Sequence, residues 1–239
     1  QHCKRVTLEL GGQSPVIVCA DADLKVAVPA IVKHTFANSG QFCYRVGRIY
    51  VHSAIYNDFV TEMTEQTIKL TVGDQFSGCD MGPMISQKIY KTSEHQTTDA
   101  KKKGARITIG GERLKGSKYD KGWFFPPTII ADADHTMDIM NEETFGPVAG
   151  VMKFSNDDEA VALANDSVYG LAAYVFSGEL GAGLRIAEDL EAGSVWVNNI
   201  QRSYHDVPFG GVKQSGIGRE KGRYGIESFT ELKTIYYSY

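Results

Sequence analysis

The strongest constraint on the fold is an alternation, repeated along the whole chain, of short apolar runs and longer helix-type segments. Strand-type runs are predicted at 16–19, 48–52, 105–109, 124–130, 148–154, 172–176 and 193–197. Helix-type segments separate most of them, at about 24–38, 55–70, 86–103, 157–165 and 180–190. Strands that alternate with helices favour a mainly parallel sheet covered by helices on both faces, so the chain is predicted to have an α/β fold.

Four segments depart from this alternation. The stretch 78–83 is predicted to be a loop, and 209–225 is predicted to be a loop punctuated by glycines. The run at 124–130 carries Pro126 and Pro127, so it is expected at a sheet edge or a bend. The final segment, 230–239, is β-like and rich in tyrosine. An end strand of this kind is expected to pair with a sheet edge, in its own chain or in a neighbouring subunit.

Composition and charge exclude several classes of partner. Of the 239 residues, 42% are hydrophobic and 23% are charged, which is typical of a globular protein and not of a disordered one. A net charge of -4 gives no basic footprint for a nucleic acid. No run approaches the roughly 20 apolar residues of a membrane-spanning helix, so no membrane partner is expected.

Two features bear on the origin of the chain. The first residue is Gln1 and not Met, and an apolar alternating stretch follows almost at once, so we expect a fragment of a longer protein. The four cysteines are irregularly spaced and form neither a CxxC metal pair nor a disulfide framework. This pattern favours a reducing compartment, and we expect a cytoplasmic protein with no metal site.

Cys43 is the candidate nucleophile among the four cysteines. It lies in a turn directly after a predicted helix end, where its side chain and its backbone N–H can both face a cleft. Arg45 and Arg48 are near in sequence, and positive charge favours the reactive thiolate. The alternative is that Cys43 is a small buried hydrophobic residue. The other cysteines lack this setting: Cys3, Cys19 and Cys79.

A carboxylate inside an apolar strand is the candidate general base. Glu9 lies between Leu8 and Leu10, and Gly11 and Gly12 follow. A desolvated carboxylate has a raised pKa, which brings it toward the range useful for a general base, and the glycines allow the backbone to approach a ligand closely. The alternative is a solvent-facing Glu9 in a strand that ends in a turn.

Two further motifs lie beside predicted strands. Glu142 and Glu143 lead into Phe145 and a Gly-Pro turn just before the strand at 148–154. A carboxylate there can bind ribose hydroxyls, or the acidic pair can belong to a solvated loop. The glycine density of 208–219 predicts tight turns near a site or near packed backbone. The sequence contains no GxGxxG, P-loop, HExxH or GxSxG motif.

Taken together and in this order, the four motifs resemble those of the NAD(P)-dependent aldehyde dehydrogenase superfamily along essentially the whole chain. The family's glutamate motif is matched at 8–12 and its cysteine motif at 40–43, with Glu9 and Cys43 34 positions apart as in the family. The EExFGPV motif is matched at 142–148, and the PFGGxKxSG motif at 208–216. The resemblance implies the family's catalytic domain at 1–225 and a C-terminal bridging strand for oligomerisation at 226–239.

The resemblance implies a role for each motif. Cys43 would attack the aldehyde to give a thiohemiacetal and, after hydride transfer to NAD or NADP, a thioester, which a water activated by Glu9 would hydrolyse. The backbone N–H of Cys43 would form part of the oxyanion hole. Glu143 would hold the nicotinamide ribose. The nicotinamide ring would contact Leu10 and Phe145. The substrate pocket would be formed by Phe42, Tyr44, Phe209 and Ser203.

The resemblance also bears on substrate and assembly. The branch that oxidises succinate semialdehyde places an arginine six residues before the nucleophile, where this chain has Ala37, so that substrate is disfavoured. Phe42 and Tyr44 favour an apolar or aromatic aldehyde. Possible anchors for a polar or anionic substrate are Arg202, Ser203 and His205. We expect a homo-oligomer, either a dimer or a tetramer, in the intact protein.

Two departures from the family pattern affect these expectations. Position 13 is Gln where the family commonly has Lys. The family's cofactor-binding domain precedes the matched region and is absent from this chain, as is the asparagine that completes the oxyanion hole. We therefore expect that this chain neither binds NAD(P) tightly nor oxidises aldehydes at a normal rate.

Two other functions remain open from the residues alone. Cys43 could pair with His34, His52 or His205 in a cysteine-dependent esterase or thiol hydrolase. Nothing in the spacing supports such a pairing, and it leaves the motifs around Glu9 and Glu143 unexplained. Alternatively, the chain is a folded interaction module with an inert thiol and an exposed end strand.

Overall fold

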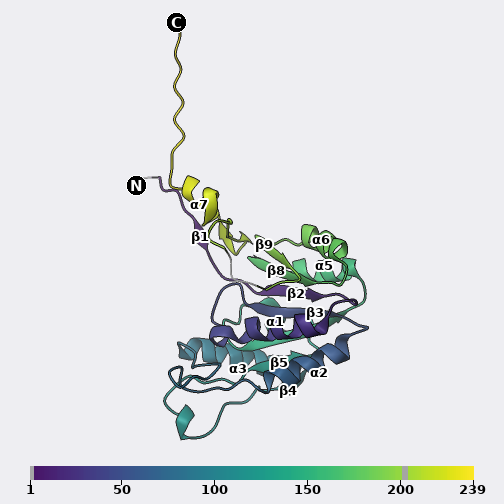
Figure 1. Ribbon diagram of the computed structural model, residues 1–239. Helices are drawn as coiled ribbons and strands as arrows, with labels where there is room; N and C mark the ends of the chain where they lie inside the picture. The colour runs from purple at the N-terminus through teal and green to yellow at the C-terminus, as the bar shows by residue number, and fades with distance from the viewer. Residues whose placement is uncertain (1–2, 201–203) are drawn as a thin grey trace.

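Seven strands form the central sheet, in the order β4-β5-β6-β3-β2-β8-β9 (Figure 1). The computed structural model describes residues 3–200 and 204–239. The strands are β2 Ser14–Val18, β3 Val46–His52, β4 Arg106–Ile109, β5 Thr128–Ala131, β6 Val148–Phe154, β8 Ala172–Phe176 and β9 Ser194–Val197. Every neighbouring pair is parallel except β4 with β5. The predicted mainly parallel α/β sheet is confirmed.

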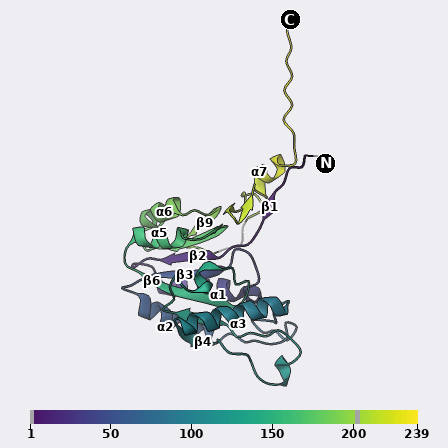
Figure 2. The ribbon, with the colours of Figure 1, turned by 180° about the vertical axis from the view of Figure 1, so that it is seen from behind.

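Helices cover both faces of this sheet (Figures 1 and 2). α1 (Leu24–Phe36) and α2 (Tyr56–Thr67) share one hydrophobic cluster with the strands. The helices of the second cluster are α3 (Gln87–Lys102), α4 (Asp138–Asn141), α5 (Asp157–Asn165) and α6 (Leu180–Asp189). Strand side chains alternate between the clusters, since Val16 and Val18 lie in the first and Ile17 lies in the second. Burial on both faces explains why these strands are continuous apolar runs in the sequence.

Local sequence sets the ends of two helices. The Asp23 carboxylate accepts a hydrogen bond from the Lys25 N–H at 2.9 Å, and Ser86 Oγ accepts one from the Ile89 N–H at 3.4 Å. Both are N-cap bonds, which satisfy donors that have no partner inside the helix. α1 ends at Phe36, two residues before the predicted end, because the chain then enters the irregular turn 37–40.

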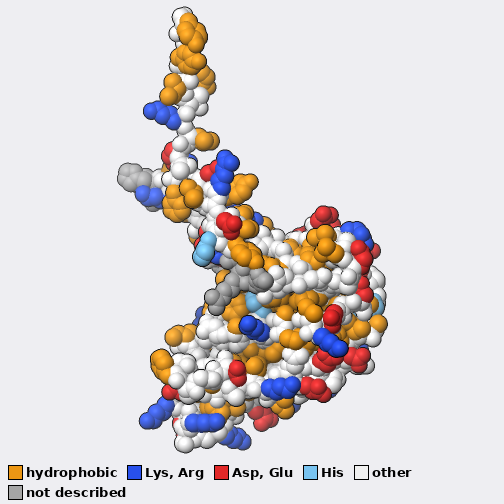
Figure 3. Space-filling model, in the orientation of Figure 1, with side chains coloured by type: hydrophobic (Ala, Val, Ile, Leu, Met, Phe, Trp, Pro, Cys, Tyr) orange, Lys and Arg blue, Asp and Glu red, His pale blue; other side chains and the backbone are white. Residues whose placement is uncertain are grey.

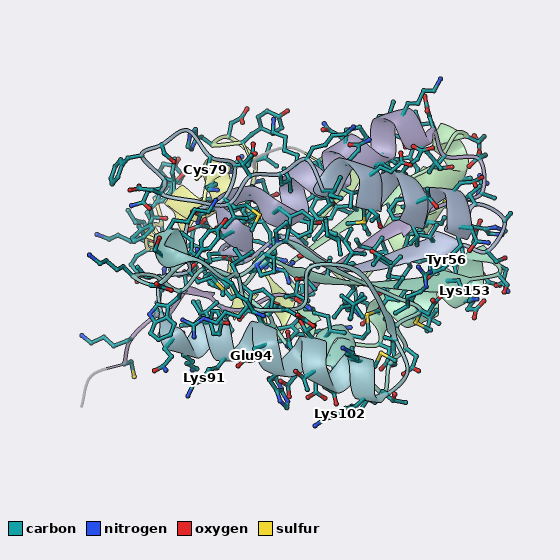
Figure 4. All side chains as sticks on the ribbon, turned by 90° about the horizontal axis from the view of Figure 1, so that it is seen from below. Tyr56, Cys79, Lys91, Glu94, Lys102 and Lys153 are labelled. Atoms are coloured by element: carbon teal, nitrogen blue, oxygen red, sulfur yellow. The ribbon has the colours of Figure 1, made fainter. Side chains whose placement is uncertain are left out.

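The helices lie on the surface of the sheet with one polar face outward. On α3, Lys91 and Lys102 are exposed and point away from the sheet (Figure 4), whereas Tyr90 and Ala100 are buried. Among residues 3–200 and 204–239, no helix is long and apolar enough to cross a bilayer.

The strand predicted at 124–130 is wrong in its first half. The observed strand, β5, begins only at Thr128 and runs to Ala131. Pro126 and Pro127 lack the N–H that a ladder needs, so they cannot extend it toward residue 124.

A small arm extends from one end of the sheet (Figure 1). In it, β1 (Leu8–Glu9) pairs antiparallel with β11 (Gly216–Ile217), and α7 (Gly222–Glu227) follows. β10 (Val212–Lys213) pairs with β7 (Tyr169–Gly170) and ties the arm to the body. The prediction of a plain glycine-rich loop at 209–225 is therefore wrong, because its tight turns allow two short strands and the start of a helix.

The chain ends in an extended tail, residues 229–239, that projects from the arm (Figures 1 and 2). Hydrophobic side chains follow one another along it in Figure 3. Phe229, Leu232 and Tyr236 in this tail are each at least 91% exposed. The tail has no strand partner within the described part of the chain. Its pairing with a neighbouring subunit stays a prediction.

Candidate active site

Three of the predicted site segments precede three neighbouring parallel strands. Glu9 and the two glycines lead into β2, Cys43 leads into β3, and Glu143 leads into β6. Because β2, β3 and β6 are adjacent and parallel, their amino ends lie at one edge of the sheet, and the three segments meet there. Open parallel sheets usually bind ligands beyond their carboxyl ends. This candidate site lies at the opposite edge.

A turn of left-handed residues leads into the nucleophile segment, which we define as residues 41–46. Asn38, Ser39 and Gly40 have φ angles of 50°, 56° and 75°. This conformation costs a non-glycine residue about 1–2 kcal/mol, and Ser39 Oγ compensates in part by donating to the Gly82 carbonyl at 2.8 Å. A Cβ at Gly40 would lie 2.3 Å from the Gly146 carbonyl oxygen. Close packing at Gly40 therefore holds the nucleophile segment against the loop that carries Glu143.

The thiol of Cys43 is partly buried, and its surroundings oppose ionisation. Burial raises the pKa of Cys43, and the carboxylates of Glu9 and, more weakly, Glu143 raise it further. The backbone N–H groups of Cys43 and Tyr44 face the sulfur and lower this pKa in part. The thiol is therefore protonated at rest, and its deprotonation needs a base.

The prediction that Arg45 and Arg48 favour the thiolate is wrong. Arg45 is buried and donates to the carbonyls of Val46 and Val148 at 2.8 Å each, which joins β3 to β6. Arg48 is also buried and donates through Nε to the Gln13 carbonyl at 2.8 Å. Both guanidinium groups bind main-chain oxygens. The charged side chains that shift the pKa of the Cys43 thiol are therefore the carboxylates of Glu9 and Glu143.

Glu9 reaches the site from β1 of the arm. Burial raises the pKa of its carboxyl group and Glu220 raises it further, while Lys221 and Arg219 oppose both effects. One carboxylate oxygen, Oε1, is buried without a hydrogen-bond partner. The predicted raised pKa is confirmed in direction, and the Glu9 carboxylate in turn raises the pKa of the Cys43 thiol.

Gly11 and Gly12 allow two site segments to approach each other. The Gly12 N–H donates to Glu143 Oε1 at 2.9 Å, and a Cβ at Gly11 would lie 2.7 Å from Glu143 Oε2. A Cβ at Gly12 would lie 2.6 Å from the Cys43 carbonyl oxygen. The sequence predicts space for a ligand at these glycines, whereas in the structure the space is filled by Glu143 and by the backbone of Cys43.

Gln13 fixes the loop on either side of Glu143. Its side chain is 1% exposed, and Nε2 donates to the Ile139 carbonyl at 2.8 Å and to Thr144 Oγ1 at 3.3 Å. The other amide atom, Oε1, is buried without a partner. Phe145, next in the loop, has a left-handed φ of 49°. Gln13 and the strained turn together hold the carboxylate of Glu143 in its place.

Aromatic side chains gather beside the nucleophile. The ring centroids of Phe42 and Tyr44 are 5.2 Å apart, and those of Tyr44 and Phe209 are 5.5 Å apart. The structure thus brings together three of the four residues predicted for the substrate pocket. Phe42 and Tyr44 line a cavity of about 1000 Å³, and Ala37 and His205 also line it. Ser203 and Arg202, the other predicted contacts, lie outside the described residues.

Sequence reasoning did not place three further residues in this aromatic group, although it named His34 as a possible base partner of Cys43. His34, Tyr174 and Trp196 belong to α1, β8 and β9 and contact the ring of Tyr44 or one another. No local motif marks them, because they meet only through the order of strands in the sheet.

The alternative nucleophiles lie elsewhere, but two of the alternative base partners do not: His34 packs against Phe42 and Tyr44, and His205 lines the same cavity. Burial raises the pKa of Cys19 to about 11, and Cys79 lies in the loop between α2 and α3, where its Sγ donates to the Asp74 carbonyl at 3.1 Å (Figure 4). His52 contacts the Ser155 carbonyl at the far end of β3. The groups that set the pKa of Cys43 include no histidine. Within the described ranges, no cluster of His, Cys, Asp and Glu could hold a metal ion.

Comparison with known proteins agrees with this fold. Residues 1–235 match the model described as "Aldehyde dehydrogenase family", so the chain belongs to this family.

Individual curated relatives match nearly the whole of this chain. A probable succinate-semialdehyde dehydrogenase [NADP(+)] from Sinorhizobium fredii is 45% identical over 97% of this chain and 47% of its own length. Retinaldehyde dehydrogenase 3 from Rattus norvegicus is 43% identical over 98% of this chain and 45% of its own length. The chain spans about half the length of the curated relatives it matches.

Solved structures give the same result. Betaine aldehyde dehydrogenase from Staphylococcus aureus, in complex with NAD+, superposes with a TM-score of 0.89 and 40% identity, covering 93% of this chain and 44% of that one. Lactaldehyde dehydrogenase from Escherichia coli superposes with a TM-score of 0.92 and 35% identity, covering 98% of this chain and 48% of that one.

Proposed function

We propose that this chain carries the catalytic residues for oxidation of an aldehyde to a carboxylic acid with NAD or NADP. The observation that carries the proposal is that Cys43, Glu9 and Glu143 lie in segments that precede three neighbouring parallel strands, so they meet at one edge of the sheet. The three groups are a protonated thiol and two carboxyl groups whose pKa values burial raises, and the Gly12 N–H anchors only the carboxyl group of Glu143 among these two. They suit the roles of nucleophile, general base and ligand anchor.

Cys43 acts first in this proposal. Its thiol loses its proton to solvent water, the sulfur attacks the carbonyl carbon of the aldehyde, and the carbonyl oxygen takes up a proton to form a thiohemiacetal. The N–H of Cys43 stabilises the charge that develops on the carbonyl oxygen, and one such donor is worth roughly 3–4 kcal/mol in comparable sites.

The residues at the sheet edge fit a nicotinamide nucleotide. Glu143 has one oxygen fixed by the Gly12 N–H, and its half-buried carboxylate can accept from ribose hydroxyls. Phe145 lines a hollow of about 550 Å³ beside Gln41, which supports a contact with the nicotinamide ring. Leu10 is 48% exposed on the arm, and we propose it as the second contact of the ring. The chemistry that an oxidised nicotinamide supplies when bound is acceptance of a hydride, which converts the thiohemiacetal to a thioester.

Glu9 completes the proposed reaction. As a carboxylate it takes a proton from water, whose oxygen attacks the thioester carbon, and the carbon–sulfur bond breaks to release the carboxylic acid and the Cys43 thiol. Burial makes Glu9 a stronger base than an exposed glutamate, since its pKa is raised.

Phe42 and Tyr44 support an apolar or aromatic aldehyde as the substrate. Both rings line the large cavity, and Ala37, which shares this wall, supplies no charge for a substrate carboxylate. The relative from Sinorhizobium fredii bears the name of a succinate-semialdehyde dehydrogenase. A comparison of that semialdehyde with an apolar aldehyde, made on the intact protein, tests the preference proposed here.

The exposed tail supports a homo-oligomer, a dimer or a tetramer, in which residues 229–239 pair with a neighbouring subunit. Its hydrophobic side chains are more exposed than a monomer normally leaves them. We also propose that the protein is located in the cytoplasm.

The release of p-nitrophenol from p-nitrophenyl acetate, in the absence of cofactor, tests the nucleophile. We expect a burst of about one equivalent per chain, followed by slow turnover, and we expect Cys43→Ala to abolish the burst. Cys79→Ala is the matched control, because Cys79 Sγ donates to the Asp74 and Met81 carbonyls of its own loop, and its replacement is expected to leave the burst unchanged. A burst that persists in Cys43→Ala contradicts the proposal.

A further inference from the structure

One titratable side chain beside the nucleophile has no part in the chemistry described so far. His34 lies in the last turn of α1, and its ring packs among three other rings. The ring centroids are 5.0 Å from Phe42, 5.6 Å from Tyr44 and 5.1 Å from Tyr174. Phe42 and Tyr44 are the residues on either side of Cys43, so one imidazole contacts both neighbours of the nucleophile.

The polar atoms of His34 also lead to the nucleophile segment. Nδ1 accepts a hydrogen bond from the Val46 N–H at 3.3 Å, so the proton of the neutral ring lies on Nε2. Nε2 lies 3.5 Å from the hydroxyl of Tyr174, and that hydroxyl donates to the Tyr44 carbonyl at 2.7 Å. The imidazole thus reaches the main chain of the nucleophile segment directly at Val46 and through Tyr174 at Tyr44.

The charge state of His34 suits this arrangement. Burial lowers its pKa to about 3, and Arg45 contributes in the same direction. The ring is therefore neutral across the pH range in which a thiol and a carboxylate work together. A neutral ring keeps Nδ1 free to accept, whereas a protonated ring would lose the bond from Val46.

We propose that His34 is a positioning residue, whose ring and Nδ1 acceptor hold the nucleophile segment so that the N–H groups of Cys43 and Tyr44 face the Cys43 sulfur. The inference rests on the proposed function, since it matters for catalysis only if Cys43 is the nucleophile. The ring packs against Phe42 and Tyr44. The Nδ1 acceptor binds the N–H of Val46 and so fixes the end of α1 relative to the first residue of β3.

Two substitutions separate packing from hydrogen bonding. His34→Phe keeps an aromatic ring of similar size and removes both nitrogens. His34→Asn removes the ring but places an amide oxygen near the position of Nδ1, where it can still accept from Val46. His52→Phe is the matched control, because it removes a histidine at the opposite end of β3. There the imidazole contacts the Ser155 carbonyl and the Phe154 ring, and Nδ1 accepts a hydrogen bond from the Ala54 N–H at 3.2 Å.

The readout is the rate of alkylation of Cys43 by iodoacetamide as a function of pH, measured on the Cys43 peptide by mass spectrometry. This rate follows the thiolate fraction, which depends on the N–H groups that face the sulfur. We expect His34→Phe to slow alkylation at pH 7.5 about 10-fold and to raise the apparent pKa of Cys43 by about one unit. We expect His34→Asn to recover to within about 3-fold of the parent chain, and His52→Phe to match it.

A folded His34→Phe chain with the alkylation profile of the parent overturns the inference, as does a His34→Asn chain that is as slow as His34→Phe. Thermal melting and far-UV circular dichroism establish that each variant is folded. If His34→Phe does not fold, Tyr174→Phe decides, because it removes only the hydroxyl that binds the Tyr44 carbonyl. Slowing of about 3-fold in Tyr174→Phe supports the inference, and an unchanged rate contradicts it.

The alkylation experiment is independent of ester chemistry. A parent chain without a Cys43-dependent burst contradicts the proposed function, and the alkylation profile still decides the role of His34. A parent chain with a normal burst and an alkylation profile that is the same in all His34 variants keeps the proposed function and refutes this inference.

Discussion

The nucleophile and the general base are held by two very different parts of the molecule. The nucleophile segment, 41–46, lies inside the body, between the end of α1 and the start of β3, and Arg45 within it is 1% exposed. Glu9 lies on the arm, in the two-residue strand β1. The residues on either side of Glu9, Leu8 and Leu10, are 38% and 48% exposed. β1 is held by two residue pairs with β11 and by the Leu10 N–H, which donates to the Ser215 carbonyl at 3.0 Å.

This difference shows that the site is assembled from a strongly supported half and a weakly supported half. The position of Cys43 depends on the packing of the whole sheet, so it is lost only when the body is disturbed. The position of Glu9 depends on a short strand pairing, so it can change while the body stays folded. The two halves are therefore separable by substitution, and each of the following predictions addresses one of them.

The largest effect is expected at Gly40, in the strongly supported half. Gly40→Ala places a Cβ 2.3 Å from the Gly146 carbonyl oxygen at a φ of 75°, and we expect it to lower the free energy of unfolding by about 4 kcal/mol, measured by urea denaturation. Gly104→Ala is the control, because Gly104 has a φ of 96° with nothing within 4 Å of the added Cβ. There the positive φ alone should cost about 1 kcal/mol. Equal losses in the two variants would show that packing at Gly40 is not what holds the segment.

A smaller effect is expected at Gln13, which connects the two halves through the Glu143 loop. Gln13→Met keeps the volume but leaves the Ile139 carbonyl and Thr144 Oγ1 without their donor, and we expect a loss of about 2 kcal/mol in unfolding free energy. Gln13→Lys is the matched variant, since an ammonium can donate to the same two oxygens, and it should lose less. A Gln13→Met chain as stable as the parent contradicts the role of this amide.

In the weakly supported half, Gly216 allows the close pairing of β11 with β1, the strand that carries Glu9. A Cβ at Gly216 would lie 2.2 Å from the Leu8 carbonyl oxygen, so Gly216→Ala is expected to displace β1 and slow deacylation about 10-fold, equivalent to about 1.4 kcal/mol. The rate of acylation and the thermal midpoint should change little. Gly218→Ala is the control, because its Cβ would meet only ordinary contacts with Thr7. Equal loss of acylation and deacylation in Gly216→Ala would show that the halves are not separable.

The smallest effect is a pH dependence of stability that Glu9 introduces. Burial, with Glu220, raises the folded-state pKa of Glu9 above its unfolded value, so the folded state holds the proton more tightly. The corresponding stability is fully present below the unfolded pKa and is lost as the pH rises through the folded pKa. Glu9→Gln should therefore melt about 2 °C above the parent at pH 8, with the difference disappearing near pH 4. A parent chain that melts at a higher temperature than Glu9→Gln at both pH 8 and pH 4 would contradict the predicted direction of this pH dependence.

The sequence was sufficient for the class of fold. Continuous apolar runs separated by amphipathic segments predict a parallel sheet with two covered faces, because each run must be buried on both sides. The motifs at Glu9, Cys43 and Glu143 each precede a predicted strand. What a local pattern does not contain is that β6 lies next to β3, more than 90 residues away in sequence, which is the pairing that brings Glu143 to the nucleophile segment.

The wrong and missing predictions share a physical reason. Arg45 and Arg48 are close to Cys43 along the chain, but their guanidinium groups turn to main-chain oxygens of neighbouring strands, so proximity in sequence gave the wrong sign for the pKa shift of the thiol. His34 and Tyr174 reach the nucleophile segment through tertiary packing of α1 and β8 and carry no local signal. Long-range packing decides these contacts, and short motifs do not report it.

The central claim is that Cys43 forms the covalent intermediate and that Glu9, from the arm, activates the water that removes it. Mass spectrometry of Glu9→Gln after mixing with p-nitrophenyl acetate tests it most directly. The account predicts that the Cys43 peptide gains one acetyl group at the rate of the parent burst and that this acetyl group persists about 10²-fold longer than in the parent. Acetyl loss at the parent rate in a folded Glu9→Gln chain, or acetylation at any residue other than Cys43, would contradict the claim.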